Sequence, residues 1–200
     1  MNSLPWWHTG ETVSALCHEI KKFSAADGGN EYDIGFLTGT VIDSVFYACL
    51  DEDLIPDKNP LSSDEREILE HAFVRGRDGT TVYTLRLEVL SCHVEALKYL
   101  LFGNHAELTL EILLETHRLM MRTVKPLLAG KLRTTEACVN CFQYLPASQI
   151  PLLLPLTLAT HSSRANDDLV NLSARLFYEI VHCIRPFEEG NGCIGRLLVS

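Results

Sequence analysis

The chain has 200 residues, of which 46% are hydrophobic and 22% are charged, and its formal net charge at pH 7 is −9. This length supports one domain, or one domain with a small helical appendage, and it allows a sizeable core. The negative charge argues against a nucleic-acid partner, which usually requires a basic surface. We therefore expect a globular protein that binds no nucleic acid.

The apolar stretches are too short to cross a bilayer. The most apolar of them, residues 150–159, is interrupted by Pro151 and Pro155. The N-terminus lacks the cationic and apolar pattern of a signal peptide. We therefore expect no membrane partner and a cytoplasmic or nuclear location.

The seven cysteines are an odd number scattered through apolar segments, which is typical of reduced thiols. Cys138 and Cys141 have the spacing of a metal-binding pair. Zinc would need two further ligands, and the sequence offers no second pair of this kind. We expect idle thiols here rather than a metal or redox site.

The first two thirds of the chain show helical periodicity. A helix is expected to begin at Ser62, because Ser62 and Glu65 have the spacing of a capping box, and to end at residues 75–79. His93 and His117 lie on or beside the apolar faces of two long helices, so we expect both in the core. The other expected features are helices at residues 12–23, 33–50, 81–102 and 106–128, a break at 27–30 and a loop at 51–60.

Residues 130–146 interrupt this pattern with the β-branched and aromatic residues of an extended or hairpin structure. Helical periodicity returns at residue 150, breaks at 162–167 and resumes from 168 to 184. The predicted fold class is therefore all-α with a small β-hairpin.

The last predicted long helix leads into Ile184-Arg185-Pro186-Phe187-Glu188-Glu189-Gly190-Asn191-Gly192-Cys193-Ile194-Gly195-Arg196. Gly190 and Gly192 favour a tight turn that brings backbone N–H groups to a helix N-terminus, where an anion is stabilised. A carboxylate such as Glu189 fits that place if it holds Mg²⁺ against a phosphate. Arg196 lies one turn further on and is expected to reach the same phosphate. The alternative is a glycine-containing loop between core helices with solvated charges.

This stretch resembles the motif of the Fic (Fido) family, His-Pro-Phe-x-Asp/Glu-Gly-Asn-Gly-Arg-x-x-Arg. Two positions depart from it, because Arg185 stands at the family histidine and Cys193 at the first family arginine. The resemblance extends over roughly residues 108–200. The residues that match the motif at the same spacing are Pro186, Phe187, Glu189, Gly190, Asn191, Gly192 and Arg196.

The resemblance implies a Fic-type helical bundle. It implies a Fic-like domain at residues 61–200, preceded by an N-terminal helical region at 1–60. Residues 131–146 would be the family's flap, on which a target protein docks by strand addition. Residues 38–44 are the best candidate for a degenerate form of the family's inhibitory helix, with Asp43 in place of its glutamate.

Fic proteins typically transfer AMP from ATP to a Ser, Thr or Tyr hydroxyl of a target protein. By resemblance, Glu189 would hold Mg²⁺, and Gly190, Asn191 and Gly192 would cradle phosphate. Arg196 would pair with the terminal phosphate or with an inhibitory carboxylate. Phe187 would anchor the loop to the core. The implied cofactors are therefore Mg²⁺ and ATP.

Arg185 occupies the catalytic position of the general base, but a guanidinium with a pKa above about 12 cannot accept a proton. Loss of general-base assistance costs a factor of about 10²–10⁴ in rate. His182, one turn earlier, and Cys193, as a nucleophile, are weaker substitutes. The motif thus predicts weakened or absent transfer.

Three interpretations follow. The first is a Fic-like domain, weakened or inactive, that retains nucleotide binding. The second is an active transferase with an altered base or donor, and the third is a non-catalytic protein-interaction module. Since the chain ends at Ser200, barely two turns after the motif, we expect a truncated chain, a domain completed by a partner, or an incomplete domain. An oligomer is among the expected partners.

Overall fold

The computed structural model describes residues 31–199 apart from 52, 78, 80, 104, 106, 140, 141 and 163–167. The helix expected at residues 12–23 and the break at 27–30 lie outside the described residues. The chain divides into two compact units, Met1–Phe36 and Leu37–Ser200. In the first unit, only the backbone of residues 31–36 is described, and it is helical.

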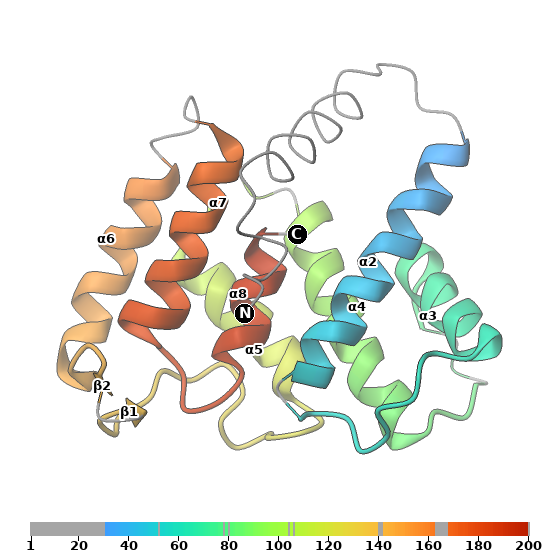
Figure 1. Ribbon diagram of the computed structural model, residues 1–200, viewed down its shortest axis with the longest axis horizontal. Helices are drawn as coiled ribbons and strands as arrows, with labels where there is room; N and C mark the ends of the chain where they lie inside the picture. The colour runs from blue at the N-terminus through green and yellow to red at the C-terminus, as the bar shows by residue number, and fades with distance from the viewer. Residues whose placement is uncertain are drawn as a thin grey trace, which may run out of the picture. The chain divides into compact units, whose positions relative to one another are not determined.

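Helices make up most of the described chain. β1 (Cys138–Val139) and β2 (Phe142–Gln143) form a two-stranded antiparallel pair in which Cys138 lies opposite Gln143. The all-α class is confirmed, whereas the use of the hairpin as a flap stays a prediction. The helices, labelled in Figure 1, are α2 (Glu31–Asp51), α3 (Ser63–Arg75), α4 (Leu85–Phe102), α5 (Leu110–Met121), α6 (Ile150–Ser162), α7 (Leu169–Tyr178) and α8 (Asn191–Val199), with the 3-10 turn η2 (Ala147–Gln149) and the π-helix η3 (Glu179–Ile184) between them.

The capping box at the start of α3 is confirmed. The Ser62 hydroxyl accepts a hydrogen bond from the Glu65 N–H at 3.2 Å, and the Glu65 carboxylate accepts one from the Ser62 N–H at 2.9 Å. Each bond satisfies a donor that the first helical turn leaves without an intrahelical partner. The local sequence therefore fixes where α3 begins.

Three helix ends differ from the prediction. The helix expected at residues 81–102 begins at Leu85, because Thr84 caps it by accepting from the Leu87 N–H. The helix expected at 106–128 covers only Leu110–Met121, with Thr109 as its N-cap. The apolar pattern continues beyond both helices, and the capping threonines decide where they begin.

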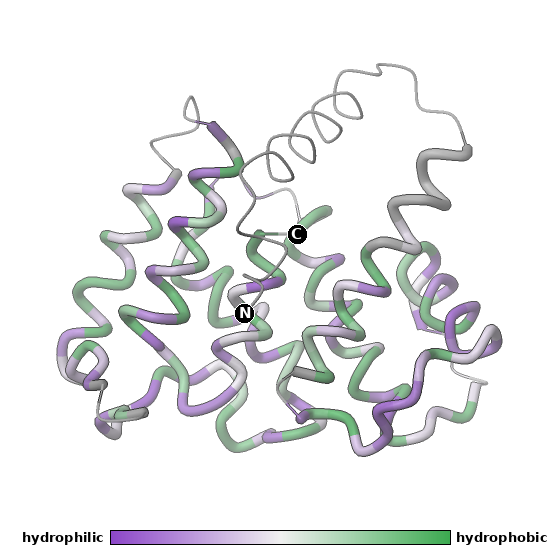
Figure 2. Tube along the Cα trace, viewed as in Figure 1, coloured by the Kyte–Doolittle hydropathy of each residue, from purple (hydrophilic) through white to green (hydrophobic). Residues whose placement is uncertain are grey.

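The core lies where α2, α4, α5, α6, η3 and α8 meet. α4 packs against both α3 and α5, and α8 packs against α7 and η3. Figure 2 shows hydrophobic and hydrophilic residues alternating along α7, as expected for a helix with one buried side. The largest fully buried side chains are Phe187, Ile42, Leu69, Leu90, Leu97, Leu113, Met120, Met121, Ile150, Leu154, Leu158 and Ile180.

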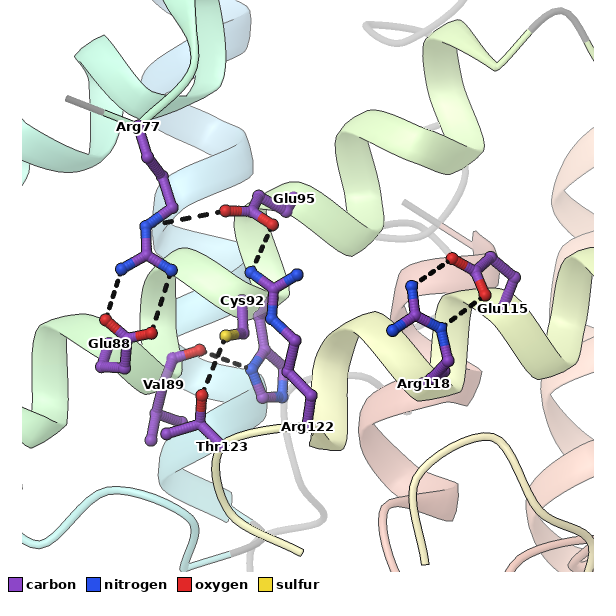
Figure 3. Close-up of polar contacts among 10 residues, drawn as sticks. Arg77, Glu88, Val89, Cys92, Glu95, Glu115, Arg118, Arg122 and Thr123 are labelled. Atoms are coloured by element: carbon purple, nitrogen blue, oxygen red, sulfur yellow. Dashed lines mark hydrogen bonds and ion pairs between the residues drawn. The ribbon is translucent and has the colours of Figure 1, made fainter. Parts of the chain in front are cut away.

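Polar contacts join α4 to the segments on either side of it (Figure 3). Arg77, just after α3, donates two hydrogen bonds to the Glu88 carboxylate of α4. Arg122, at the end of α5, donates to Glu95 of α4. These pairs are partly buried, so they hold the helices in register more firmly than exposed ion pairs would. They stabilise the helix pair that carries His93 and His117.

Both histidines lie in the core, as predicted. His93 has no exposed surface and contacts the Val89 carbonyl oxygen through Nδ1 at 2.9 Å. His117 is 1% exposed. In the described part of the chain, no helix has the length and apolar character needed to cross a bilayer.

Candidate functional site

The glycine-containing turn lies between η3 and α8. η3 has the wider π-helical form; it ends at Ile184 and is capped by Arg185, whose backbone is left-handed (φ 49°, ψ 66°). The Arg185 N–H donates to the Ile180 carbonyl at 2.8 Å. A left-handed arginine is uncommon, because its Cβ crowds the following carbonyl, so the surrounding contacts must hold it there. The helix predicted to run from 168 to 184 is thus regular only as far as Tyr178.

Gly190 turns the chain into α8. Its φ is +78°, and a Cβ at this position would lie 3.0 Å from Met120 Cε and Met121 Sδ and 3.2 Å from His117 Nε2. Both the left-handed conformation and the close approach favour glycine. The Gly190 carbonyl accepts from the Ile194 N–H at 3.0 Å, which makes Gly190 the N-cap of α8. The backbone amides that follow therefore open a helix of nine residues.

Asn191 stabilises the turn from within. Its side chain is 1% exposed; its Oδ1 accepts from the Phe187 N–H at 3.0 Å and its Nδ2 donates to the Phe187 carbonyl at 2.8 Å. The amide side chain therefore closes the loop onto Phe187 and does not face a ligand. What remains for an anion is the backbone at the start of α8, since the first N–H groups of a helix have no intrahelical acceptor.

His117 of α5 packs against the turn and forms hydrogen bonds with its backbone. Its Nδ1 accepts from the Gly130 N–H at 3.0 Å, so the neutral ring carries its proton on Nε2 and donates it to the Glu189 carbonyl at 3.1 Å. The ring stacks on Phe187 with centroids 3.7 Å apart. Burial lowers the pKa of His117 from 6.5 to about 4. His117 is therefore neutral at pH 7 and fixes the loop backbone.

Arg133 fastens the turn to the hairpin. It is 3% exposed, and its guanidinium donates to the carbonyl oxygens of Thr135, Leu145, Ile184 and Arg185. The sequence places Arg133 only within residues 131–146, the stretch that corresponds by resemblance to the family's flap. The residues it joins are up to 52 positions away, so no local pattern could reveal its contacts.

The charged residues of the turn lie on its outer side. Glu189 is exposed and pairs with Lys125 at 3.1 Å. The Glu188 carboxylate accepts from the Thr135 hydroxyl at 2.8 and 2.9 Å. The Arg185 guanidinium lies over the Tyr144 ring, 5.2 Å from its centroid. The carboxylate proposed as a metal ligand is thus accessible, although its present partner is a lysine.

Cys193 faces inward, toward α2. It has no exposed surface, and its thiol donates to the Ala48 carbonyl at 3.2 Å. Burial raises the pKa of the nearby Cys49 thiol, a hydrogen bond with Cys193 adds to the rise, and the charge of Arg196 opposes it. Arg196 is half-buried and lies close enough to α2 to act on Cys49. A buried thiol that is held by a backbone carbonyl has little access to a substrate, which disfavours a catalytic Cys193.

Two further candidates from the sequence are His182, as a substitute base, and Asp43, as the carboxylate of the inhibitory segment. His182 is exposed on η3, beside the rings of Phe177 and Tyr178. Asp43, the carboxylate of the suggested inhibitory segment, accepts a hydrogen bond from Arg66 of α3 at 2.7 Å. The domain boundaries and the inhibitory role of residues 38–44 stay predictions.

A surface cavity of about 290 Å³ is formed by residues outside the turn. Its lining residues are Asp64, Glu67, Ile68, His71, Thr81 and Tyr83, which belong to α3 and to the segment before α4. In the described part of the chain, no group of three or more His, Cys, Asp or Glu side chains could hold a metal ion.

Comparison with known proteins finds a family resemblance in the carboxy-terminal part of the chain. Residues 107–200 match the model of the Fic/DOC family. The chain is 31% identical over 138 residues to the protein adenylyltransferase fic-1 of Caenorhabditis briggsae, and 35% identical over 98 residues to the protein adenylyltransferase Fic of Drosophila grimshawi. The chain is therefore similar to proteins that are named protein adenylyltransferases.

These alignments cover part of each protein. The C. briggsae match spans 68% of this chain and 24% of its relative, and the D. grimshawi match spans 47% and 20%. The chain thus spans about a quarter or less of the length of these curated relatives. Their activity as whole proteins transfers to this chain only as a proposal.

Solved structures show the same fold. A Fic domain-containing signalling protein from Bacteroides thetaiotaomicron superposes with a TM-score of 0.65 at 18% identity, covering 92% of this chain and 69% of that one. Fic-1 from Caenorhabditis elegans gives a TM-score of 0.60 at 20% identity, covering 94% and 57%. At these identities the likeness establishes a Fic-type helical fold and nothing about activity.

Proposed function

We propose that the Fic domain binds Mg²⁺-bound ATP at the turn formed by Gly190, Asn191 and Gly192, and that its AMP-transfer activity is weak or absent. The donor and the reaction class come from the relationship to protein adenylyltransferases. The observation that carries the proposal is the left-handed backbone of Gly190 (φ +78°). This turn directly precedes α8, whose first backbone N–H groups have no intrahelical acceptor. Such a turn at a helix N-terminus favours phosphate.

The side chains around the turn fit a metal-bound phosphate. Glu189 is exposed, and Lys125, its partner at 3.1 Å, carries a charge that a bound cation can replace. When bound, Mg²⁺ neutralises phosphate charge and orients the phosphates. Mg²⁺ is usually held by one or two carboxylates together with phosphate oxygens, so a single glutamate at the turn suffices.

Transfer to a hydroxyl requires an acceptor for the hydroxyl proton, and Arg185 cannot serve. Its guanidinium lies against Tyr144, where the flap would hold a target segment. His117 is buried, and both of its ring nitrogens already form hydrogen bonds to the backbone. Without general-base assistance, the rate falls by a factor of about 10²–10⁴. We infer a nucleotide-binding domain with little catalytic power.

The exposed edge of the hairpin supports a second part of the proposal. Cys138 and Gln143 are exposed and lie in strands of only two residues each. An extended segment of a target protein could add to such an edge through backbone hydrogen bonds. Residues 131–146 are thus the proposed docking site for a protein partner.

The test uses labelled ATP and the Arg185→His variant. We expect no transfer by the unmodified chain and measurable transfer to added proteins, or to the chain itself, by the variant. The Arg185→Lys variant is the control, because it removes the guanidinium but introduces no imidazole base. It should show no transfer. Label transferred by the unmodified protein, and lost in Glu189→Ala, would favour the alternative of an active enzyme with an altered base.

Restoring the second departure from the motif is less informative. The Cys193 side chain is fully buried against the Ala48 carbonyl, so an arginine there would displace α2 or leave a buried charge unpaired. The Cys193→Arg substitution would therefore combine a change in phosphate binding with a loss of stability. Arg185→His changes a half-buried side chain at the surface of the turn and avoids this ambiguity.

A further inference from the structure

We infer that Arg133 is a positioning residue that joins the base of the hairpin and the entry to the glycine turn into one cooperative unit. A segment bound along the hairpin and a phosphate bound at the turn would therefore strengthen each other's binding. The role of the turn in phosphate binding rests on the proposed function, whereas the physical coupling does not.

These acceptors come from both sides of the hairpin and from the turn. Nη1 donates to the Thr135 carbonyl at 2.7 Å, and Nη2 donates to the Leu145 carbonyl, so the guanidinium joins the two ends of the hairpin. Nη2 also donates to the Ile184 carbonyl at 3.1 Å, and Nε donates to the Arg185 carbonyl at 2.6 Å. One buried side chain thus contacts three segments of the chain.

Backbone contacts run in parallel with the side chain. The Arg133 N–H donates to the Pro186 carbonyl at 2.9 Å, and the Leu145 N–H donates to the Cys183 carbonyl at 3.2 Å. Local opening of either the hairpin base or the turn would break its hydrogen bonds to the other segment. It would also leave some guanidinium N–H groups of Arg133 buried without an acceptor. Because hydrogen bonds to a charged group contribute more than neutral ones, this shared donor makes separate opening costly.

The shape of the side chain matters as much as its charge. A guanidinium presents five N–H donors in a fixed plane, which allows one group to reach carbonyls on several segments. A lysine would keep the charge but present a single ammonium on a flexible stem. Arg133→Lys should therefore preserve the fold while weakening the link between hairpin and turn.

The left-handed backbone of Arg185 depends on the same contacts. The Arg185 N–H donates to the Ile180 carbonyl, and the Arg185 carbonyl accepts from Arg133. Hydrogen bonds therefore hold both backbone polar groups of this residue in place. Any shift of the hairpin base that moved the Arg133 side chain would release this residue. The turn would then lose the geometry that presents the amides of α8.

A measurement on the unmodified protein tests the link directly. Native-state amide exchange reports the free energy of opening of each protected N–H. We expect the Arg133, Tyr144 and Leu145 amides at the hairpin base to share one opening free energy, and one denaturant dependence, with the Arg185 and Phe187 amides of the turn. Opening of the hairpin amides at lower free energy, independently of the turn, would overturn the inference.

The Arg133→Lys variant tests the assignment to this side chain. We expect exchange of the same five amides to accelerate together by at least tenfold. The matched control is Arg86→Lys, because Arg86 is also buried (6% exposed) and donates to a backbone carbonyl, that of Asn59. The control should accelerate exchange near Asn59 and leave the hairpin and turn within about twofold. Equal effects of both substitutions would reduce Arg133 to a general contribution to stability.

Adding Mg²⁺-ATP separates this inference from the proposed function. In the unmodified protein, we expect nucleotide to slow exchange of the Tyr144 and Leu145 amides as well as the turn. In Arg133→Lys, nucleotide should slow exchange at the turn alone, an effect that a loss of stability would not produce. If nucleotide changes no amide in either protein, the nucleotide proposal fails, and the ligand-free rates still decide the role of Arg133.

Discussion

Substituting Gly190 by alanine tests the conformation on which the candidate site depends. At φ +78°, an alanine costs about 1–2 kcal/mol relative to glycine, because its Cβ crowds the neighbouring carbonyl. The new Cβ would also lie 3.0 Å from Met120 Cε and Met121 Sδ, and this crowding adds about 1 kcal/mol even though both groups end flexible side chains. We expect Gly190→Ala to destabilise the protein by about 2–3 kcal/mol.

The matched control is Gly39→Ala. Gly39 lies inside α2, and a Cβ there would meet nothing within 4 Å. Alanine in a helix interior is more stable than glycine by about 0.5–1 kcal/mol, so this variant should be stabilised. Urea unfolding of the three proteins, followed by circular dichroism and extrapolated linearly to water, measures both changes. A Gly190→Ala variant as stable as the unmodified protein would show that the turn is not held in the left-handed form.

Three further predictions concern the surroundings of the turn. The pKa of His117 is lowered to about 4 in the folded protein, so on acidification the unfolded chain binds this proton before the folded one does. The free energy of unfolding should therefore be full above pH 6.5 and fall by about 3 kcal/mol as the pH drops toward 4. His117→Gln should remove this part of the pH dependence in urea melts. Ser62→Ala removes a capping box and should cost about 1 kcal/mol in the same assay, and a neutral result would contradict the cap. Thr135→Val removes an exposed hydrogen bond to Glu188 and should change stability by less than about 0.5 kcal/mol, so a larger loss would show a stronger tether than exposure suggests.

Local sequence predicted the elements whose signals lie within one or two helical turns. The capping box at Ser62 and Glu65 fixed the start of α3. Thr84 and Thr109 are equally good caps, but the apolar pattern around them continued and masked the boundary. The capping threonines determine where both helices begin, whereas hydrophobic periodicity alone does not.

The supports of the turn were harder to predict, because they join distant segments. The position of Gly190 was evident from the motif, but its packing against His117, 73 residues earlier, was not. The four carbonyls around Arg133 converge only after the chain has folded. The direction of Cys193, toward Ala48 rather than toward a ligand, likewise depends on where α2 packs. The direction of a side chain in a loop thus depends on which distant segments pack against that loop, so local sequence does not predict it.

The central claim is that this turn binds a metal-bound phosphate although it lacks a proton acceptor. Calorimetric titration with Mg²⁺-ATP tests that claim most directly, with Glu189→Ala as the loss variant and Glu188→Ala as its control, because Glu188 is equally exposed but bonds to Thr135. We predict saturable binding by the unmodified protein, at least tenfold weaker binding by Glu189→Ala, and unchanged binding by Glu188→Ala. No heat at millimolar nucleotide, or an equal loss in both variants, would contradict the account.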